Sequence, residues 1–169
     1  MKRIVWHYTY SQIDEILRSG VLLPPAMIPG YAATEYNVPQ GARENGGYIA
    51  DKKLLLFSSN QVWEPASYRG YWINGTAIDL LRPEQYDRLG VAMHRIGVDA
   101  SVLKPWIRLK AIVRMPDWMG RGLEETARQL GSNPVSEWWG TTVPVPAAKW
   151  EAVESRVNGV WQPMFEEAA

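Results

Sequence analysis

Residues 4–25 read IVWHYTYSQIDEILRSGVLLPP, and this stretch does most to set the expected fold. Residues 4–9 are mainly β-branched and aromatic, which predicts a strand. Ser11 can cap a helix whose apolar side chains recur at helical spacing, and Gly20 is placed to end that helix. Pro24-Pro25 then keeps the chain extended. The stretch therefore predicts an opening strand followed at once by a short helix.

The rest of the chain alternates short apolar runs with turn-rich connections. Residues 26–53 contain Pro and Gly without sustained periodicity and are expected to form a long loop or lid, and residues 60–71 a second irregular stretch. Asn158-Gly159 favours the positive φ angles of a tight hairpin turn. The other expected elements are strands at 54–59 and 91–98, a helical turn at 82–86, a segment of helical spacing at 101–114, a helix at 120–131, an extended segment at 138–146 and a hairpin at 152–162.

These elements predict an α+β fold with mixed or antiparallel sheets, a short N-terminal helix and long loops. The length of 169 residues is typical of one domain, so residues 1–169 are expected to form a single domain. The 18 basic and 18 acidic side chains balance, which argues against a general nucleic-acid coat protein. The chain lacks the continuous apolar stretch of a signal peptide or a membrane span, so we expect a cytoplasmic protein with no membrane partner.

The residue types exclude several kinds of site. The absence of cysteine removes disulfides, thiolate nucleophiles and zinc–thiolate centres. With two histidines a metal centre would have to be mostly carboxylate, and no metal is expected. No nucleotide-binding glycine fingerprint, phosphate-loop lysine or nucleophile-elbow serine is present. The chain has nine Trp and eight Tyr but only two Phe. Because Trp and Tyr carry polar groups that need partners, this excess predicts a role beyond simple packing.

Two strand ends carry groups suited to hydrogen bonding. His7 and Thr9 lie two apart on the first strand, so both point to one face and could together bind a sugar hydroxyl or a carbonyl. Ser58 and Ser59 end a later apolar strand and offer small donors to a ligand passing close by. The simpler alternatives are a half-buried histidine satisfied by the backbone and serines of the kind that often end strands.

A carboxylate beside two indoles is the third candidate. Glu137 precedes Trp138 and Trp139, where it could polarise a ribose hydroxyl. The alternative is a surface glutamate that opens a strand. Glu151 and Glu154 are rival carboxylates, and Glu154 alternates with apolar residues along the predicted hairpin. The sequence does not choose among the three.

These stretches resemble a known fold family. A His-x-Thr strand, an immediate helix, a strand ending in Ser-Ser and a later glutamate resemble the ADP-ribosyltransferase fold of the His–Tyr–Glu type. The segments HYT and IDEILRSGVLLPP look like the opening of DNA-targeting ADP-ribosyltransferase toxins and are also similar to tRNA 2′-phosphotransferases. Three later segments also resemble uncharacterised phage and bacterial proteins: LLLFSSNQVWEP, HRIGVD and NPVSEWWGTTVPVPAAKWEAVESRVNGVW.

The resemblance implies roles around NAD as co-substrate. It implies that His7 hydrogen-bonds the nicotinamide-side ribose with support from Thr9, that Ser58 and Ser59 hold the ribose or nicotinamide pocket, and that Glu137 is catalytic. Tyr8 belongs to the same strand and joins the cofactor-binding candidates. The family's stacking tyrosine has no direct counterpart, and Phe57 and Trp63 are the nearest aromatic residues. Glu137 is not part of a Glu-x-Glu pair, which argues against arginine-type transfer.

The cation that binds the pyrophosphate would be Arg43, Arg69 or Arg95. Of these, Arg95 is predicted to be the cofactor-binding residue. Four tryptophans adjoin the three candidate stretches and could form the walls of one cleft: Trp6, Trp63, Trp138 and Trp139. Glu137 near the ribose would stabilise the positive charge that develops when the nicotinamide–ribose bond breaks.

The first functional hypothesis is therefore an ADP-ribosyltransferase or NAD-cleaving enzyme related to phage proteins or toxins, whose acceptor is a protein, DNA or a small molecule. The alternative is a non-catalytic phage or host interaction protein that uses the same fold to bind a nucleotide or a protein partner. A third hypothesis is a hydrolase or phosphotransferase acting on a nucleotide or RNA end, which would use His7 with arginines and not require Glu137.

Overall fold

An antiparallel sheet of seven strands, in the order β11-β10-β6-β1-β3-β8-β7, organises the fold. The structure is a computed structural model and describes residues 2–27 and 54–165. The expected loop at 26–53 thus falls almost wholly outside the described residues. The strands of this sheet are β1 (Ile4–Thr9), β3 (Leu55–Ser58), β6 (His94–Asp99), β7 (Lys104–Pro105), β8 (Trp138–Thr141), β10 (Trp150–Val157) and β11 (Val160–Pro163).

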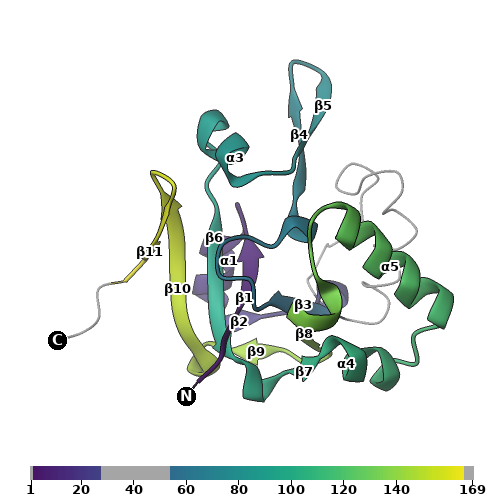
Figure 1. Cartoon of the computed structure of the whole chain (residues 1–169). Helices are drawn as coiled ribbons and strands as arrows, with labels where there is room; N and C mark the ends of the chain where they lie inside the picture. Colours follow the sequence, from purple (N-terminus) through teal and green to yellow (C-terminus); the bar gives the residue numbers. More distant parts are fainter. Residues whose placement is uncertain (1, 28–53, 166–169) are drawn as a thin grey trace.

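The sheet divides between β1 and β3. Strand β1 pairs with β6 along its whole length, but it pairs with β3 only where Trp6 lies opposite Ser58. In Figure 1, β6 and β10 run nearly upright, whereas β3 runs across the view. The two parts of the sheet, β11-β10-β6-β1 and β3-β8-β7, therefore meet at one backbone pair and separate beyond it.

Each face of the sheet carries its own core. Val5, Phe57 and Ile96 lie on the face covered by α1 (Ile13–Ser19), which we call the α1 face. The two-stranded sheet of β2 (Val21–Leu22) and β9 (Val145–Pro146) packs there as well. The opposite face, called the α4 face, carries Trp6, Tyr8 and Trp138. Because side chains alternate along a strand, each face receives every second residue.

Helices cover the α4 face. They are α3 (Pro83–Leu89), α4 (Trp106–Ile112), α5 (Asp117–Gln129) and α6 (Pro134–Glu137). The helical spacing in residues 101–114 is confirmed only over α4, because Lys104–Pro105 form β7 and Pro105 lies just before the helix. The helix expected at 120–131 begins earlier, at Asp117, and ends at Gln129. Helices and antiparallel strands together confirm the α+β class.

Helix α1 confirms one end signal and corrects the other. Gly20 ends the helix in the left-handed conformation with φ of +66°. The N-cap is Gln12, not Ser11, and the Gln12 side chain makes no capping hydrogen bond. The Ile13 N–H already donates to the Tyr10 carbonyl at 3.2 Å, so the backbone turn satisfies a donor that a serine cap would have served.

The described residues contain two β-hairpins, of which one was predicted from the sequence. The β10–β11 hairpin is confirmed, with positive φ at both Asn158 and Gly159. A second hairpin, β4 (Arg69–Ile73) with β5 (Thr76–Leu80), turns at Asn74-Gly75 with the same positive φ angles. It projects away from the sheet in Figure 1. The prediction that residues 60–71 are irregular throughout was wrong at this strand, because the second Asn-Gly signal was overlooked.

The strand expected from residue 91 begins at His94. The Val91 N–H donates to the Tyr86 carbonyl and so completes the end of α3. Because Val91 belongs to the end of this helix, it does not join the strand. No helix within residues 2–27 or 54–165 combines the length and apolar character needed to cross a membrane.

Candidate functional site

Three candidate stretches that are distant in sequence lie on neighbouring strands. Ser58 pairs with Trp6 on one side and with Trp138 on the other, which joins β1, β3 and β8. The Ser59 N–H donates to the Glu137 carbonyl at 2.9 Å, so the ladder continues one residue beyond β3. The point where the two parts of the sheet separate therefore holds the ends of all three stretches.

The imidazole of His7 is fixed beside this division. Its Nδ1 lies 2.9 Å from the Leu56 carbonyl oxygen. Because a carbonyl only accepts hydrogen bonds, Nδ1 carries the hydrogen and the Nε2 of the neutral ring is left as an acceptor. Burial lowers the pKa of His7 from its ordinary value, the Leu56 hydrogen bond opposes this, and the charge of Arg69 lowers it further. The ring is therefore neutral near pH 7.

The alternation of β1, β3 and β6 divides the candidate residues between the two faces of the sheet. The α1 face receives His7, Thr9 and Ser59. The α4 face receives the other four: Tyr8, Ser58, Trp63 and Arg95. From the sequence, all seven residues were expected to surround a single ligand. Residues adjacent along a strand point in opposite directions, so they cannot all reach the same ligand.

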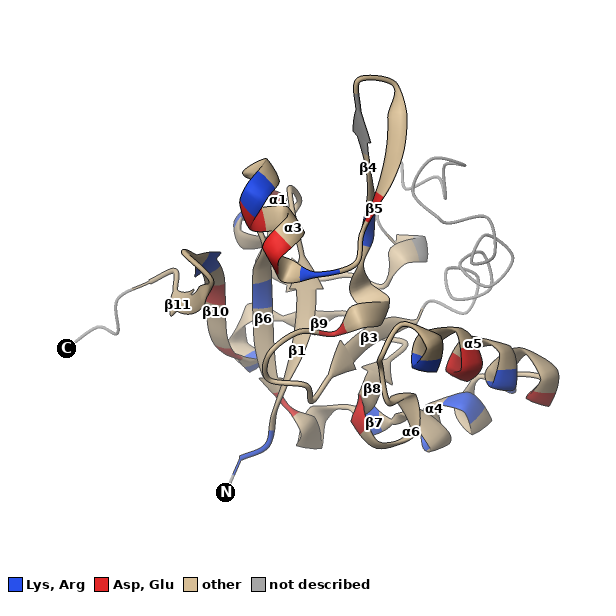
Figure 2. Ribbon diagram, turned by 45° about the horizontal axis from the view of Figure 1, so that its top comes forward, with Lys and Arg blue, Asp and Glu red and all other residues tan. Residues whose placement is uncertain are grey.

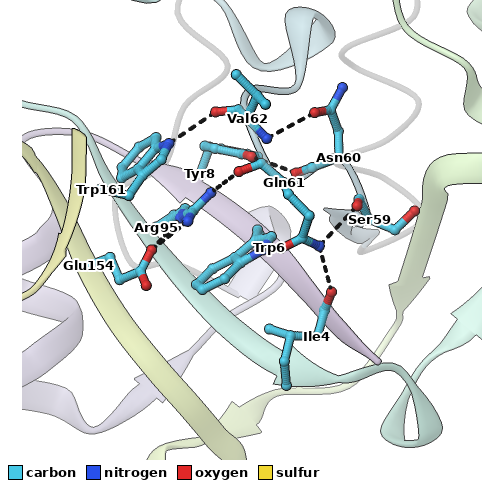
Figure 3. Close-up of polar contacts among 10 residues, drawn as sticks. All are labelled: Ile4, Trp6, Tyr8, Ser59, Asn60, Gln61, Val62, Arg95, Glu154 and Trp161. Atoms are coloured by element: carbon cyan, nitrogen blue, oxygen red, sulfur yellow. Dashed lines mark hydrogen bonds and ion pairs between the residues drawn. The ribbon is translucent and has the colours of Figure 1, made fainter. Parts of the chain in front are cut away.

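Arg95 lies in an enclosed cage on the α4 face, drawn in Figure 3. Its Nε and Nη2 contact Oε2 of Glu154 at 2.6 and 2.5 Å, and its Nη1 donates to the Gln61 carbonyl at 2.5 Å. The guanidinium carbon lies 3.8 Å from the ring centre of Trp6 and 4.3 Å from that of Trp161. With the Arg95 side chain only 7% exposed, these contacts favour a structural role for it over phosphate binding.

Tyr8, Ser58 and Trp63 serve the same internal structure. The Tyr8 hydroxyl donates to the Asn60 carbonyl at 2.9 Å, and burial raises the pKa of Tyr8 to about 12, so the phenol stays protonated. The Ser58 hydroxyl oxygen accepts the Asn60 N–H at 3.1 Å. The Trp63 ring packs edge-on against Tyr8, with 5.3 Å between ring centres. Through these contacts, the three residues hold residues 60–63 against the sheet.

Arg3 is a residue that the sequence reasoning missed. Its Nη2 donates to the Ser59 hydroxyl oxygen at 3.1 Å, and its guanidinium carbon lies 5.1 Å from the ring centre of Trp139. The Nε1 of Trp139 is buried and has no hydrogen-bond partner among the described residues. The signal was available, because Arg3 alternates with Val5 and His7 on the predicted strand.

Arg69 is the other cation near His7. It begins β4, and its guanidinium carbon lies 5.2 Å from the ring centre of Tyr10. Of the three arginines considered for phosphate binding, Arg69 keeps that possibility, whereas Arg95 is enclosed and Arg43 lies outside the described residues.

The three candidate carboxylates now differ. Glu154 is engaged with Arg95, and the exposed Glu151 pairs with Lys2 at 2.8 Å. Glu137 ends α6, is partly exposed and has no ion pair within residues 2–27 and 54–165. Glu137 is therefore the carboxylate of the three that is left available to a ligand.

The four tryptophans expected to line one cleft are distributed among separate clusters. Trp6 and Trp63 belong to a core cluster with Tyr86, and Trp138 belongs to another cluster that contains Trp106. The fourth, Trp139, packs against the core of the α1 face. The single-cleft interpretation was wrong, because strand alternation sends Trp138 and Trp139 to opposite faces.

The described residues contain no group of three or more His, Asp or Glu placed to hold a metal ion. Comparison of the chain with protein-family models, with curated proteins and with solved structures finds no match. The functional argument therefore depends on the geometry of this chain and on the resemblance stated above.

Proposed function

We propose that this chain is an NAD-binding enzyme of the ADP-ribosyltransferase type, with His7 and Glu137 beside the nicotinamide ribose. One observation carries the proposal. The strand order β1-β3-β8, together with the Ser59 N–H to Glu137 carbonyl bond, brings the three stretches of the resemblance together where the sheet divides. Strands far apart in sequence need not become neighbours, so this juxtaposition supports a shared site.

The chemistry available to these residues suits cleavage of the nicotinamide–ribose bond. The neutral His7 ring presents Nε2 as an acceptor, which has no hydrogen bond to the described residues and could accept one from a ribose hydroxyl. As the C–N bond breaks, nicotinamide leaves with the bonding electron pair and the anomeric carbon gains positive charge. The carboxylate of Glu137 would stabilise that charge, and an acceptor hydroxyl, amine or water would then attack the anomeric carbon and lose its proton.

Arg3 is the cation best placed for the pyrophosphate. It is exposed, shares the α1 side of the sheet with His7 and already touches Ser59. An arginine fork can make two hydrogen bonds to a phosphate, and turning toward a ligand would cost Arg3 its hydrogen bond to Ser59 and its contact with the Trp139 ring. This assignment replaces Arg95, whose guanidinium is committed to Glu154.

The test is a calorimetric titration of the full chain with NAD, followed by an assay of nicotinamide release. We expect His7→Ala to weaken NAD binding and Glu137→Gln to abolish nicotinamide release while NAD still binds. Glu151→Gln is the matched control, because that carboxylate lies at the surface and pairs with Lys2.

Full activity of Glu137→Gln would exclude the role given to Glu137. No binding of NAD at millimolar concentration would exclude the enzyme and leave the alternative, in which the fold serves as an interaction module for a nucleotide or a protein partner.

A further inference from the structure

A cavity of about 420 Å³ lies between α4 and α5, on the α4 face and so on the opposite side of the sheet from His7. The residues that line it include Lys110, Arg114 and Arg121. A cavity of this volume falls within the range of about 300 to 1,000 Å³ that small-molecule sites occupy. It is large enough for a ligand and separate from the site proposed above.

Positive charge is concentrated in these walls although the whole chain is neutral. Three of the residues that line the cavity are basic and one, Asp117, is acidic. Lys110 pairs with Glu124, which also accepts the indole N–H of Trp106 and is thereby held in place. Arg114 and Arg121 form no ion pair within residues 2–27 and 54–165. Figure 2 shows basic segments on both helices. The cavity therefore favours an anion.

The backbone at Arg114 gives a second, independent indication. Arg114 has φ of +51°, the left-handed conformation that favours glycine. Its N–H donates to the Ala111 carbonyl, and the Met115 N–H donates to the Lys110 carbonyl at 2.9 Å, which is the hydrogen-bond pattern that usually ends a helix at glycine. An arginine at this position strains the backbone, and Arg114 is one of the residues that line the cavity.

We propose that the α4–α5 cavity binds phosphate groups through Arg114 and Arg121. Arginine is the side chain best matched to phosphate, because its planar fork donates two hydrogen bonds at once. The ligand is a phosphate-bearing molecule, and its phosphates belong either to a free polyphosphate or nucleotide or to a single-stranded phosphodiester chain. The site is independent of the NAD site.

The experiment titrates the full chain with inorganic pyrophosphate by calorimetry. It then measures the fluorescence anisotropy of a labelled single-stranded oligothymidylate, with and without pyrophosphate as competitor. The variants are Arg121→Gln and Arg114→Gly, and the matched control is Arg18→Gln, which removes one exposed charge from α1 on the other face. We expect each cavity variant to weaken pyrophosphate binding about tenfold or more, and the control to leave it unchanged.

Arg114→Gly separates binding from folding. Glycine relieves the left-handed strain, so the urea midpoint of this variant should not fall while its affinity does. Competition between oligothymidylate and pyrophosphate would assign the phosphates to a nucleic-acid strand, and its absence would assign them to a small ligand. No pyrophosphate binding at millimolar concentration, or equal weakening by all three variants, would overturn the proposal. The NAD titration bears on the other site alone, so the two proposals can fail separately.

Discussion

The cage around Arg95 makes a quantitative prediction about stability. Replacing Arg95 by Met removes the positive charge between two indoles and leaves the carboxylate of Glu154 without its partner. The two side chains are only 7% and 17% exposed, so water cannot replace the lost contacts well. Breaking one side of a buried ion pair costs about 3 to 5 kcal/mol. Arg95→Met and Glu154→Leu should each lower the free energy of unfolding by an amount in this range.

The assay is urea unfolding followed by tryptophan fluorescence. With an m-value of about 2 kcal/mol per molar urea, a loss of 3 to 5 kcal/mol lowers the midpoint by about 1.5 to 2.5 M. The double variant Arg95→Met/Glu154→Leu leaves no unpaired charge and should recover most of that loss. We therefore expect a coupling free energy of at least about 3 kcal/mol between the two positions.

Two results would refute this reasoning. Additive effects, with coupling below about 0.5 kcal/mol, would mean that the ion pair in Figure 3 does not stabilise the fold. If Arg95→Met kept full stability but lost NAD binding, Arg95 would be a phosphate ligand, as the sequence first indicated.

Three further predictions concern pH and packing. The pKa of His7 and that of His94 both lie below the ordinary value, mainly because of burial, so the unfolded chain binds more protons below about pH 6.5. The free energy of unfolding should thus be highest above that pH and fall as the pH is lowered. In a His7→Gln variant, the slope of the free energy of unfolding against pH should be smaller, as measured by urea titration across pH. Gly140→Ala should destabilise by about 1 to 3 kcal/mol, because a Cβ there would lie 2.8 Å from the Leu55 carbonyl oxygen; an unchanged urea midpoint would contradict this. Gly122→Ala, on a helix with open space around it, should instead raise the melting temperature through a gain of about 0.5 to 1 kcal/mol.

The geometry of the proposed site follows from one feature of the sheet. Because β1 pairs with β3 at a single position, the strands separate beyond it and His7 can reach the Leu56 carbonyl across the division. A continuous ladder would have used that carbonyl for a backbone hydrogen bond. The same feature that limits pairing therefore orients the imidazole.

Local signals in the sequence were sufficient for several elements. Gly20 ends the first helix, and Asn158-Gly159 turns the last hairpin, because both depend on the conformations open to one or two residues. The alternation from Ile4 to Thr9 also correctly predicted that His7 and Thr9 share a face. The same period would have separated Tyr8 from them, had it been applied to the whole set of candidates.

The sequence by itself determined the α+β class, the opening strand and helix, and the residue types available for chemistry. Only the tertiary structure decided which of these residues meet. Glu154 is removed from the candidates because it pairs with Arg95 on the neighbouring strand β6, and Glu137 is brought to Ser59 by the strand order. Spacing along a chain sets the face on which a side chain lies, whereas its neighbours across the sheet depend on how strands distant in sequence pair, which no local signal encodes.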